Sequence, residues 1–243
     1  IGPISLDQFT PESLQQRIAA NPLASKAYTA GSKPRIAVVT NSTYDGLCYN
    51  AEKIADEIGS AVDFLHFDEA WYAYAAFHPF YENHYGMAKG KPREQDAIIF
   101  TTHSTHKLLA AFSQASMIHV RNSAQRNLDA ERFNESFMMH TSTSPHYGVI
   151  AACDVASKMM EGEAGRSLVQ EMHDEAIAFR RAMLHVRDDL GRDDWWFSVW
   201  QPTKVERSLD KGDTPAPMVA KREEWYLQPD GHWHGFENLV DDY

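Results

Sequence analysis

The sequence has little cysteine, no excess of positive charge and no long apolar run. Its two cysteines, Cys48 and Cys153, form no CxxC spacing, so we expect reduced thiols in a cytoplasmic protein rather than a disulfide. No apolar run reaches the length of a membrane span and no signal-peptide pattern opens the sequence, so no membrane partner is expected. The formal net charge of −11 also disfavours nucleic acid, which is bound by basic faces.

Metal-binding spacings are missing as well. Twelve histidines are present, but they form no HExxH pattern and no Cys/His cluster, so no metal site is expected. Hydrophobic residues make up 43% of the 243 positions, which is enough for a sizeable core in one large domain or slightly more. No low-complexity tract indicates disorder. The composition therefore predicts a folded, globular protein.

The most informative stretch is residues 97–107. Ala97-Ile98-Ile99-Phe100 is typical of a short buried strand, and Ser104, His106 and Lys107 follow it. Open α/β sheets bind their ligands at the carboxyl ends of strands. A lysine there can act as an amine nucleophile, and hydroxyls with an imidazole can hold a phosphate. The alternative is a surface lysine in a polar loop. We expect the apolar residues 108–112 to hold this loop against the core.

A carboxylate follows a second predicted strand. Residues 62–67 (VDFLHF) are typical of another strand, and they end at Asp68. An acid and an amine at neighbouring strand ends are the pair that pyridoxal phosphate requires. The lysine carries the cofactor as an imine, and the carboxylate keeps the pyridine nitrogen protonated so that the ring accepts electrons.

The remaining pattern predicts strands that alternate with helices or long crossovers. Such an order is typical of an α/β protein with a mainly parallel sheet flanked by helices. Gly59 is expected to end the helix that precedes the Asp68 strand. The predicted helices cover residues 11–20, about 49–58, 146–160 and 163–190; the other predicted strands cover 35–40, 115–120 and the start of 195–200; exposed connections or turns cover 121–129, 138–145 and 203–220.

At these residues the sequence resembles the large bacterial ornithine/lysine/arginine decarboxylases, which are pyridoxal-phosphate enzymes of the aspartate-aminotransferase-like fold (fold type I). The matching stretches occur in the same order along nearly the whole chain. They are residues 40–46 (TNSTYDG), 66–71 (HFDEAW), 103–119 (HSTHKLLAAFSQASMIH), 137–148 (FMMHTSTSPHYG), 200–202 (WQP) and 233–236 (WHGF).

The resemblance implies a domain organisation. Residues 1–157 would be the later part of the large domain that binds pyridoxal phosphate, and residues 158–243 the start of an α+β C-terminal domain. The chain would then be a fragment of a longer decarboxylase. In the family, the loop that cradles the phosphate and the residue that stacks on the cofactor ring lie in the earlier part, and we find no counterpart of either here.

The resemblance also implies a role for each candidate residue. Lys107 would carry the cofactor and Asp68 would pair with its ring nitrogen. Ala70 would lie beneath the ring with Trp71 nearby, Ser104 and His106 would contact the phosphate, His106 would also assist proton transfer, and Ser142 would reach the phosphate of a neighbouring subunit. The alternatives are ordinary structural roles: a helix cap for Asp68, core packing for Ala70 and Trp71, loop hydrogen bonding for His106 and turn chemistry for Ser142.

The implied reaction is decarboxylation of a basic amino acid to the corresponding amine and carbon dioxide. Lysine is slightly favoured as the substrate, and arginine and ornithine stay open. The family builds its sites across a subunit interface, so a homodimer or a larger homo-oligomer with shared active sites is expected. Two other hypotheses remain: another fold-type-I enzyme such as an aminotransferase, and a non-catalytic fragment.

Overall fold

The computed structural model describes residues 8–24, 33–44, 48–88 and 97–190, together with the pairs 204–205 and 218–219. The chain divides into two compact units, Ile1–Arg166 and Ser167–Tyr243. All seven candidate residues named above belong to the first unit.

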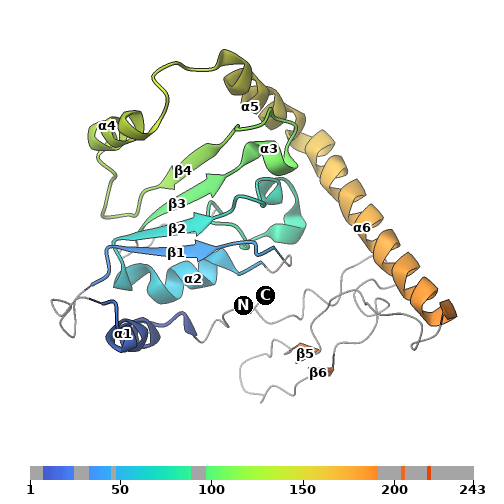
Figure 1. The fold of residues 1–243 in the computed structure, drawn as a ribbon, viewed down its shortest axis with the longest axis horizontal. Coiled ribbons are helices and arrows are strands. Elements are labelled where there is room, and N and C mark those ends of the chain that lie inside the picture. The colour runs from blue at the N-terminus through green and yellow to red at the C-terminus, as the bar shows by residue number, and fades with distance from the viewer. Residues whose placement is uncertain are drawn as a thin grey trace. The chain divides into compact units, whose positions relative to one another are not determined.

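A four-stranded sheet in the order β1-β2-β3-β4 forms the centre of the first unit (Figure 1). The strands β1 (Ile36–Thr40), β2 (Phe64–Asp68) and β3 (Ile98–His103) are parallel, and β4 (Met117–Arg121) is antiparallel to β3. The predicted α/β fold with a mainly parallel sheet is therefore confirmed. β3 continues beyond the predicted end at Phe100, so the two threonines before His103 belong to the strand.

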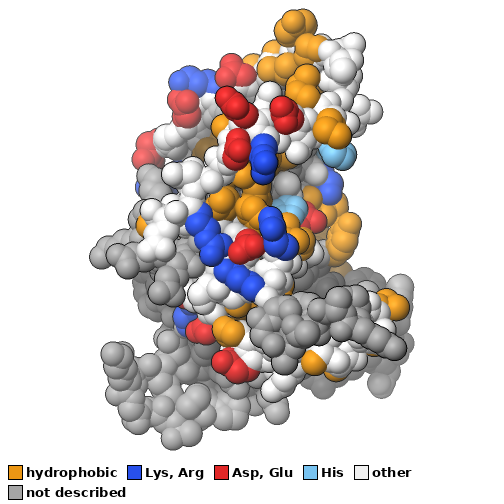
Figure 2. Space-filling model, turned by 90° about the vertical axis from the view of Figure 1, so that its left-hand side faces the viewer, with side chains coloured by type: hydrophobic (Ala, Val, Ile, Leu, Met, Phe, Trp, Pro, Cys, Tyr) orange, Lys and Arg blue, Asp and Glu red, His pale blue; other side chains and the backbone are white. Residues whose placement is uncertain are grey.

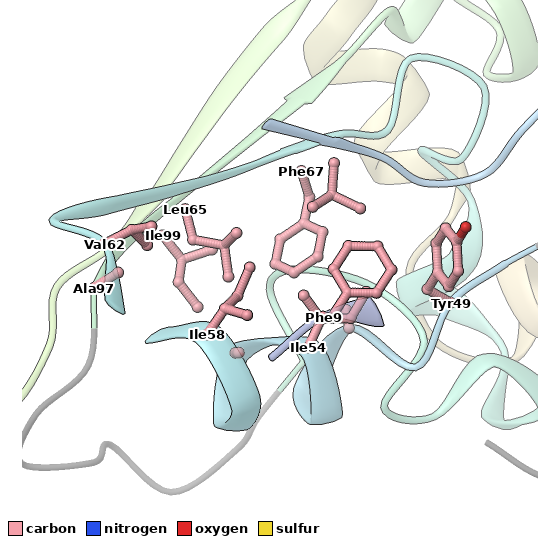
Figure 3. Close-up of a cluster of buried hydrophobic side chains, with 12 residues drawn as sticks. Phe9, Tyr49, Ile54, Ile58, Val62, Leu65, Phe67, Ala97 and Ile99 are labelled. Atoms are coloured by element: carbon pink, nitrogen blue, oxygen red, sulfur yellow. The ribbon is translucent and has the colours of Figure 1, made fainter. Parts of the chain in front are cut away.

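The core lies between one face of this sheet and the helix α2 (Ala51–Ile58) (Figure 3). Asn50 caps α2, because its side chain accepts the Lys53 amide at 3.0 Å. The helix presents Ile54 and Ile58 to Leu65 and Phe67 of β2, and these four side chains are fully buried. Ile54 and Ile58 are four residues apart, which places them on one face of the helix, and Leu65 and Phe67 are two apart, which places them on one face of the strand.

The helix α1 (Pro11–Ala20) begins where the sequence predicts. Thr10 accepts the Ser13 amide at 3.1 Å, and Pro11 occupies the first helical turn. Gly59 follows the last residue of α2 as its C-cap, so the predicted end of this helix is confirmed. Gly59 keeps a right-handed φ of −58° and begins a short 3₁₀ turn, Gly59–Ala61.

The other face of the sheet carries Phe100, and the helix α4 (Ala130–His140) contacts it there. The rings of Phe100 and Phe133 stack with centroids 6.1 Å apart. The sequence pattern did not predict α4, although Asp129 is a good cap and accepts the amides of Glu131 and Arg132, both at 3.1 Å.

Two short 3₁₀ helices, η3 (Ala75–Phe77) and η4 (Pro79–Tyr81), follow β2, and three α-helices follow β3 and α4 in the described chain. The helix α3 (Thr105–Leu108) is a single turn after β3, and α5 (Tyr147–Met159) and α6 (Gly162–Leu190) confirm the two predicted long helices. Gly162 joins α5 to α6 with a φ of +62°, a left-handed conformation that favours glycine. In the second unit, β5 (Lys204–Val205) pairs antiparallel with β6 (Met218–Val219). The predicted strand at 195–200 lies outside the described residues.

At the amino ends of the strands, basic side chains gather around an acidic one (Figure 2). Asp63 is paired with Lys33, Arg35 and Arg126 at 3.4, 3.3 and 3.0 Å. Burial acts to raise the pKa of Asp63, but Lys33 and Arg126 outweigh it and hold this pKa below its ordinary value.

Within the described residues, no helix is long and apolar enough to span a membrane.

Candidate active site

Lys107 lies at the carboxyl edge of the sheet, in the single turn α3 that follows β3. Its backbone amide donates to the Ser104 carbonyl at 2.9 Å, which closes the turn. The apolar residues 108–112 do not hold this turn against the core as expected, because Leu108 and Phe112 are 42% and 65% exposed. The turn is held instead by two hydrogen bonds from His106, one backbone and one side-chain, to the carbonyl of Ala115, which is fully buried.

Asp68 is the last residue of β2, and its Cα is in register with Thr40 of β1 and Thr102 of β3. The side chain is half-buried, and its Oδ1 accepts the Ala70 amide at 3.2 Å. The strand thus delivers a carboxylate to the edge from which Lys107 also extends. This bond closes an Asx turn, which resembles the capping role given above as the structural alternative for Asp68. Among the described contacts, Oδ2 of the same carboxylate makes no hydrogen bond, so it can bind a ligand.

Trp71 and Lys107 are in direct contact. The Lys107 ammonium lies 4.5 Å from the centroid of the Trp71 ring, which is a cation–π geometry. The Tyr44 ring packs against Trp71 edge-to-face, with centroids 5.4 Å apart. Two candidate residues, Trp71 after β2 and Lys107 after β3, are therefore brought into contact.

His106 makes the loop contact that its structural alternative predicts. Its Nδ1 donates to the Ala115 carbonyl at 2.8 Å, and its backbone amide donates to the same oxygen at 3.3 Å. This bond fixes the ring and places the proton of a neutral imidazole on Nδ1, so Nε2 remains an acceptor. Ser104 precedes α3 and is half-buried; its side chain makes no capping bond in this turn.

Ser142 lies elsewhere in the chain, in the turn between α4 and α5. It is exposed, and its hydroxyl is bonded within that turn to Ser144, as acceptor from the amide at 3.1 Å and as donor to the carbonyl at 3.3 Å. Among the described contacts, none joins Ser142 to the sheet edge. Turn chemistry accounts for its position in this single chain.

Sequence reasoning missed Glu69, which is the most buried acid among the described residues of the first unit. Its side chain is 0% exposed and accepts hydrogen bonds from Asn41 and Gly86, while His103 lies 3.2 Å from its second oxygen. The sequence offered only a second acid next to Asp68. The partners of Glu69 come from three other segments, so local pattern could not reveal them.

His66 was also missed. It lies two residues before Asp68 on the same face of β2, and its Nε2 is 3.0 Å from the Thr102 hydroxyl. Burial lowers the pKa of His66 below its ordinary value, and the nearby Asp68 charge partly offsets this effect. His66 is therefore neutral near pH 7, and the His66–Thr102 pair lies beside the Asp68 carboxylate.

The segment from residue 70 to residue 88, here called the 70–88 loop, carries a cluster of tyrosines. The rings of Tyr72, Tyr74 and Tyr81 meet edge-to-face at 5.2–5.6 Å. Cys48 lies against this cluster, and burial raises the pKa of its thiol to about 11. Neither Cys48 nor Cys153 is in a disulfide bond, and Cys48 is protonated at neutral pH.

Comparison with known proteins identifies relatives of this chain. The family whose sequence model matches residues 1–243 is described as "Orn/Lys/Arg decarboxylase, major domain". Lysine decarboxylase LdcA of Pseudomonas aeruginosa is 56% identical over the whole chain, which corresponds to 31% of that protein. Biodegradative arginine decarboxylase of Escherichia coli strain K12 is 43% identical, again over the whole chain and 33% of that protein.

Solved structures show the same relationship. The structure of lysine decarboxylase A from Pseudomonas aeruginosa matches with a TM-score of 0.75 over 100% of this chain and 31% of that one. Lysine decarboxylase LdcF of Francisella novicida matches with a TM-score of 0.72 at 41% identity, over 98% of this chain and 29% of that one. The chain spans about a third of the length of these relatives. It belongs to the ornithine/lysine/arginine decarboxylase family, and its sheet is part of the fold-type-I major domain.

Proposed function

We propose that this chain supplies the lysine and the carboxylate of a pyridoxal-phosphate site that decarboxylates a basic amino acid. The observation that carries the proposal is the placement of Asp68 and Lys107 after neighbouring parallel strands, β2 and β3, at one edge of the sheet. The family membership of the chain supports the reaction type. An aminotransferase is disfavoured, because the matched family consists of decarboxylases.

The residues at this edge fit the cofactor. Lys107 has a primary amine that can bind an aldehyde, and Asp68 has a carboxylate oxygen that can hold a ring N–H. Ser104 offers a hydroxyl and His106 a ring nitrogen to the phosphate, and the small side chain of Ala70 leaves room beneath the ring. Bound pyridoxal phosphate would supply an electron-accepting ring for the electron pair left when carbon dioxide departs.

The protein residues would then divide the work. Asp68 would hold the proton of the ring nitrogen, and the neutral His66 beside it would add no competing positive charge. The Trp71 ring covers the Lys107 amine and excludes water from one side of it. His106 is held by the Ala115 carbonyl, so its Nε2 can contact the phosphate and can accept or return a proton.

Lysine is the proposed substrate, with arginine and ornithine as alternatives. Within the sequence, residues 110–117 favour a lysine-specific member, whereas residues 45–49 and 71–87 favour an arginine-specific one. The higher identity to a lysine decarboxylase than to an arginine decarboxylase supports lysine. The net charge of −11 favours any cationic substrate to a small degree.

The domain and subunit expectations remain part of the proposal. Residues 1–157 are assigned to the cofactor domain and residues 158–243 to the start of the C-terminal domain, in line with the family resemblance. Ser142 is exposed on its turn, which is compatible with a contact to the cofactor phosphate of a second subunit in a homodimer or larger homo-oligomer.

The experiment is a product assay with the complete protein. The protein with added pyridoxal phosphate is incubated separately with lysine, arginine and ornithine, and both the amine and carbon dioxide are measured. Release of carbon dioxide with the matching amine, strongest for lysine and abolished by Lys107→Ala, is the expected result. A keto acid in place of carbon dioxide would identify an aminotransferase, and a lack of any product would favour a non-catalytic role.

A further inference from the structure

Glu69 is a fully buried acid directly after Asp68, and none of the roles proposed above uses it. The strand alternates its side chains between the two faces of the sheet, so Asp68 is half-buried on one face while Glu69 lies inside the core on the other. A buried carboxylate destabilises a fold unless it is paired and hydrogen-bonded. Its presence therefore calls for a physical account.

Four segments meet at this carboxylate. Its Oε1 accepts the Asn41 side-chain amide at 2.9 Å and the Gly86 backbone amide at 2.7 Å. Its Oε2 lies 3.2 Å from Nε2 of His103. The Glu69 backbone amide donates to the Thr102 carbonyl at 3.0 Å. One side chain thus connects the carboxyl ends of β1, β2 and β3 with the 70–88 loop.

His103 completes the surroundings of the buried carboxylate. Its side chain is only 15% exposed, and its ring packs on that of His119 with centroids 4.8 Å apart. Burial first, and the positive charge of His103 second, lower the pKa of His119. His119 therefore stays neutral, and Nε2 of His103 faces the Glu69 carboxylate.

The same network fixes the 70–88 loop. Asn41 also donates from its side-chain amide to the His84 carbonyl at 2.9 Å. Gly86 approaches so closely that a Cβ there would lie 2.4 Å from the Thr101 hydroxyl and 2.7 Å from the Phe67 ring. Only glycine allows the loop backbone to reach Glu69 at this point. The loop begins at Ala70 and carries Trp71, whose ring contacts Lys107.

We propose that Glu69 is a positioning residue of the site: its carboxylate holds Asp68 and the Trp71-bearing loop in the arrangement that receives the cofactor. Glu69 itself touches neither cofactor nor substrate. This inference rests on the proposed function, and it adds that the reach of the side chain, rather than its charge, is what the site needs. In a glutamine the amide oxygen can keep both bonds that Oε1 accepts, from Asn41 and Gly86, and the amide N–H can donate to Nε2 of His103 in its other tautomer.

The test compares three substitutions in the complete protein. Glu69→Gln keeps the reach and loses the charge, Glu69→Asp keeps the charge and withdraws it by one methylene, and Glu69→Ala loses both. The dissociation constant of pyridoxal phosphate is measured by fluorescence quenching. Removing a partner that orients a ligand-binding group typically costs about 10- to 100-fold, so we expect that increase for Ala, a smaller one for Asp and near-wild-type binding for Gln.

A control separates positioning from general loss of stability. Leu65→Ala removes a fully buried side chain from the same strand, at the end away from Glu69. At a temperature where Leu65→Ala is folded, its dissociation constant for pyridoxal phosphate is expected to match that of the wild type. The dissociation constant of Glu69→Ala is expected to be higher at the same temperature. The turnover number is expected to fall in Glu69→Ala more than the apparent affinity for the amino acid, because the acid positions cofactor groups and not the substrate.

Hydrogen exchange without cofactor provides an independent measurement. Peptides that contain Ala70 and Gly86 are expected to exchange faster in Glu69→Ala and Glu69→Asp than in the wild type or Glu69→Gln. Wild-type affinity in Glu69→Asp, weaker binding in Glu69→Gln than in Glu69→Asp, or unchanged exchange would overturn the inference. If the wild-type protein itself binds no pyridoxal phosphate, the proposed function fails, while the exchange pattern still decides whether Glu69 holds the loop.

Discussion

Asp68 and Glu69 are adjacent in the sequence, yet their carboxylates occupy opposite environments. Asp68 is half-buried and accepts one amide from Ala70, whereas Glu69 is 0% exposed and is surrounded by three donor groups. The period of the β-strand separates them onto the two faces of the sheet. One acid is thus placed to meet a ligand, and the other to hold the strand ends together.

Asp68 and Asp63 lie at opposite ends of β2, and we expect their substitution by asparagine to have different effects on decarboxylase activity. Asp68→Asn is expected to lower decarboxylation by about two to three orders of magnitude, the range for losing one preorganised electrostatic contact. Its free energy of unfolding changes little, because Asp68 is half-buried and unpaired with any described basic side chain. Asp63→Asn, at the amino end beside the basic cluster, is the matched control and keeps full activity. Equal activity of the two variants would contradict the role of Asp68.

The contact between Trp71 and Lys107 is expected to help the lysine bind cofactor. A cation–π contact contributes about 0.5–2 kcal/mol, so Trp71→Ala should weaken cofactor binding by about two- to thirtyfold. Trp71→Phe keeps an aromatic face and should lose less. Titration of both variants with pyridoxal phosphate, followed by visible absorption, measures the difference. Unchanged binding in Trp71→Ala would show that the ring only packs.

Gly86→Ala is expected to destabilise the protein by about 1–3 kcal/mol, the usual cost of overpacking a core. The new Cβ would lie 2.4 Å from the Thr101 hydroxyl, and the loop backbone must retreat from Glu69. Urea denaturation measures the loss. Gly148→Ala is the control: its Cβ would meet two exposed rings, that of His146 at 3.1 Å and that of Phe112 at 4.0 Å, so a change within about 0.5 kcal/mol is expected. Equal effects at the two glycines would argue against a tight approach at Gly86.

Stability is expected to fall on mild acidification because of two histidines. Burial lowers the pKa of both His66 and His119 below the ordinary 6.5. As the pH falls through that value, the unfolded chain takes up protons that the folded chain does not. The free energy of unfolding therefore decreases from about pH 6.5 downward until the folded-state pKa values are reached. Denaturation at several pH values should show a smaller decrease for His66→Gln and His119→Gln, and an increase in stability on acidification would contradict the assignment.

Local patterns predicted the elements whose side chains follow a regular period. The core strand with Leu65 and Phe67 and the capped helix after Thr10 both formed where expected. The lysine after β3 and the acid after β2 were also placed at one edge, because parallel strands share the direction of their ends. These features depend on residues close together in the sequence.

The features that were missed depend on partners far apart in the sequence, or on neighbouring stretches of which one favours a turn and the other a helix. The hydroxyl-rich residues after Phe137 drew attention to a turn, while the capping bonds of Asp129 start a helix before it. Phe112 looked like a core residue but is exposed in this chain. The burial of Glu69 follows from Asn41, Gly86 and His103, and no local period connects these positions.

The most direct test of the central claim locates the cofactor on the chain. The complete protein is mixed with pyridoxal phosphate, reduced with borohydride and digested, and the modified peptide is identified by mass spectrometry. The account predicts that the reduced cofactor is attached to Lys107 and that Lys107→Ala carries none. Stable attachment at a different lysine, or no attachment to the wild-type protein, would contradict the assignment of this sheet edge as the cofactor site.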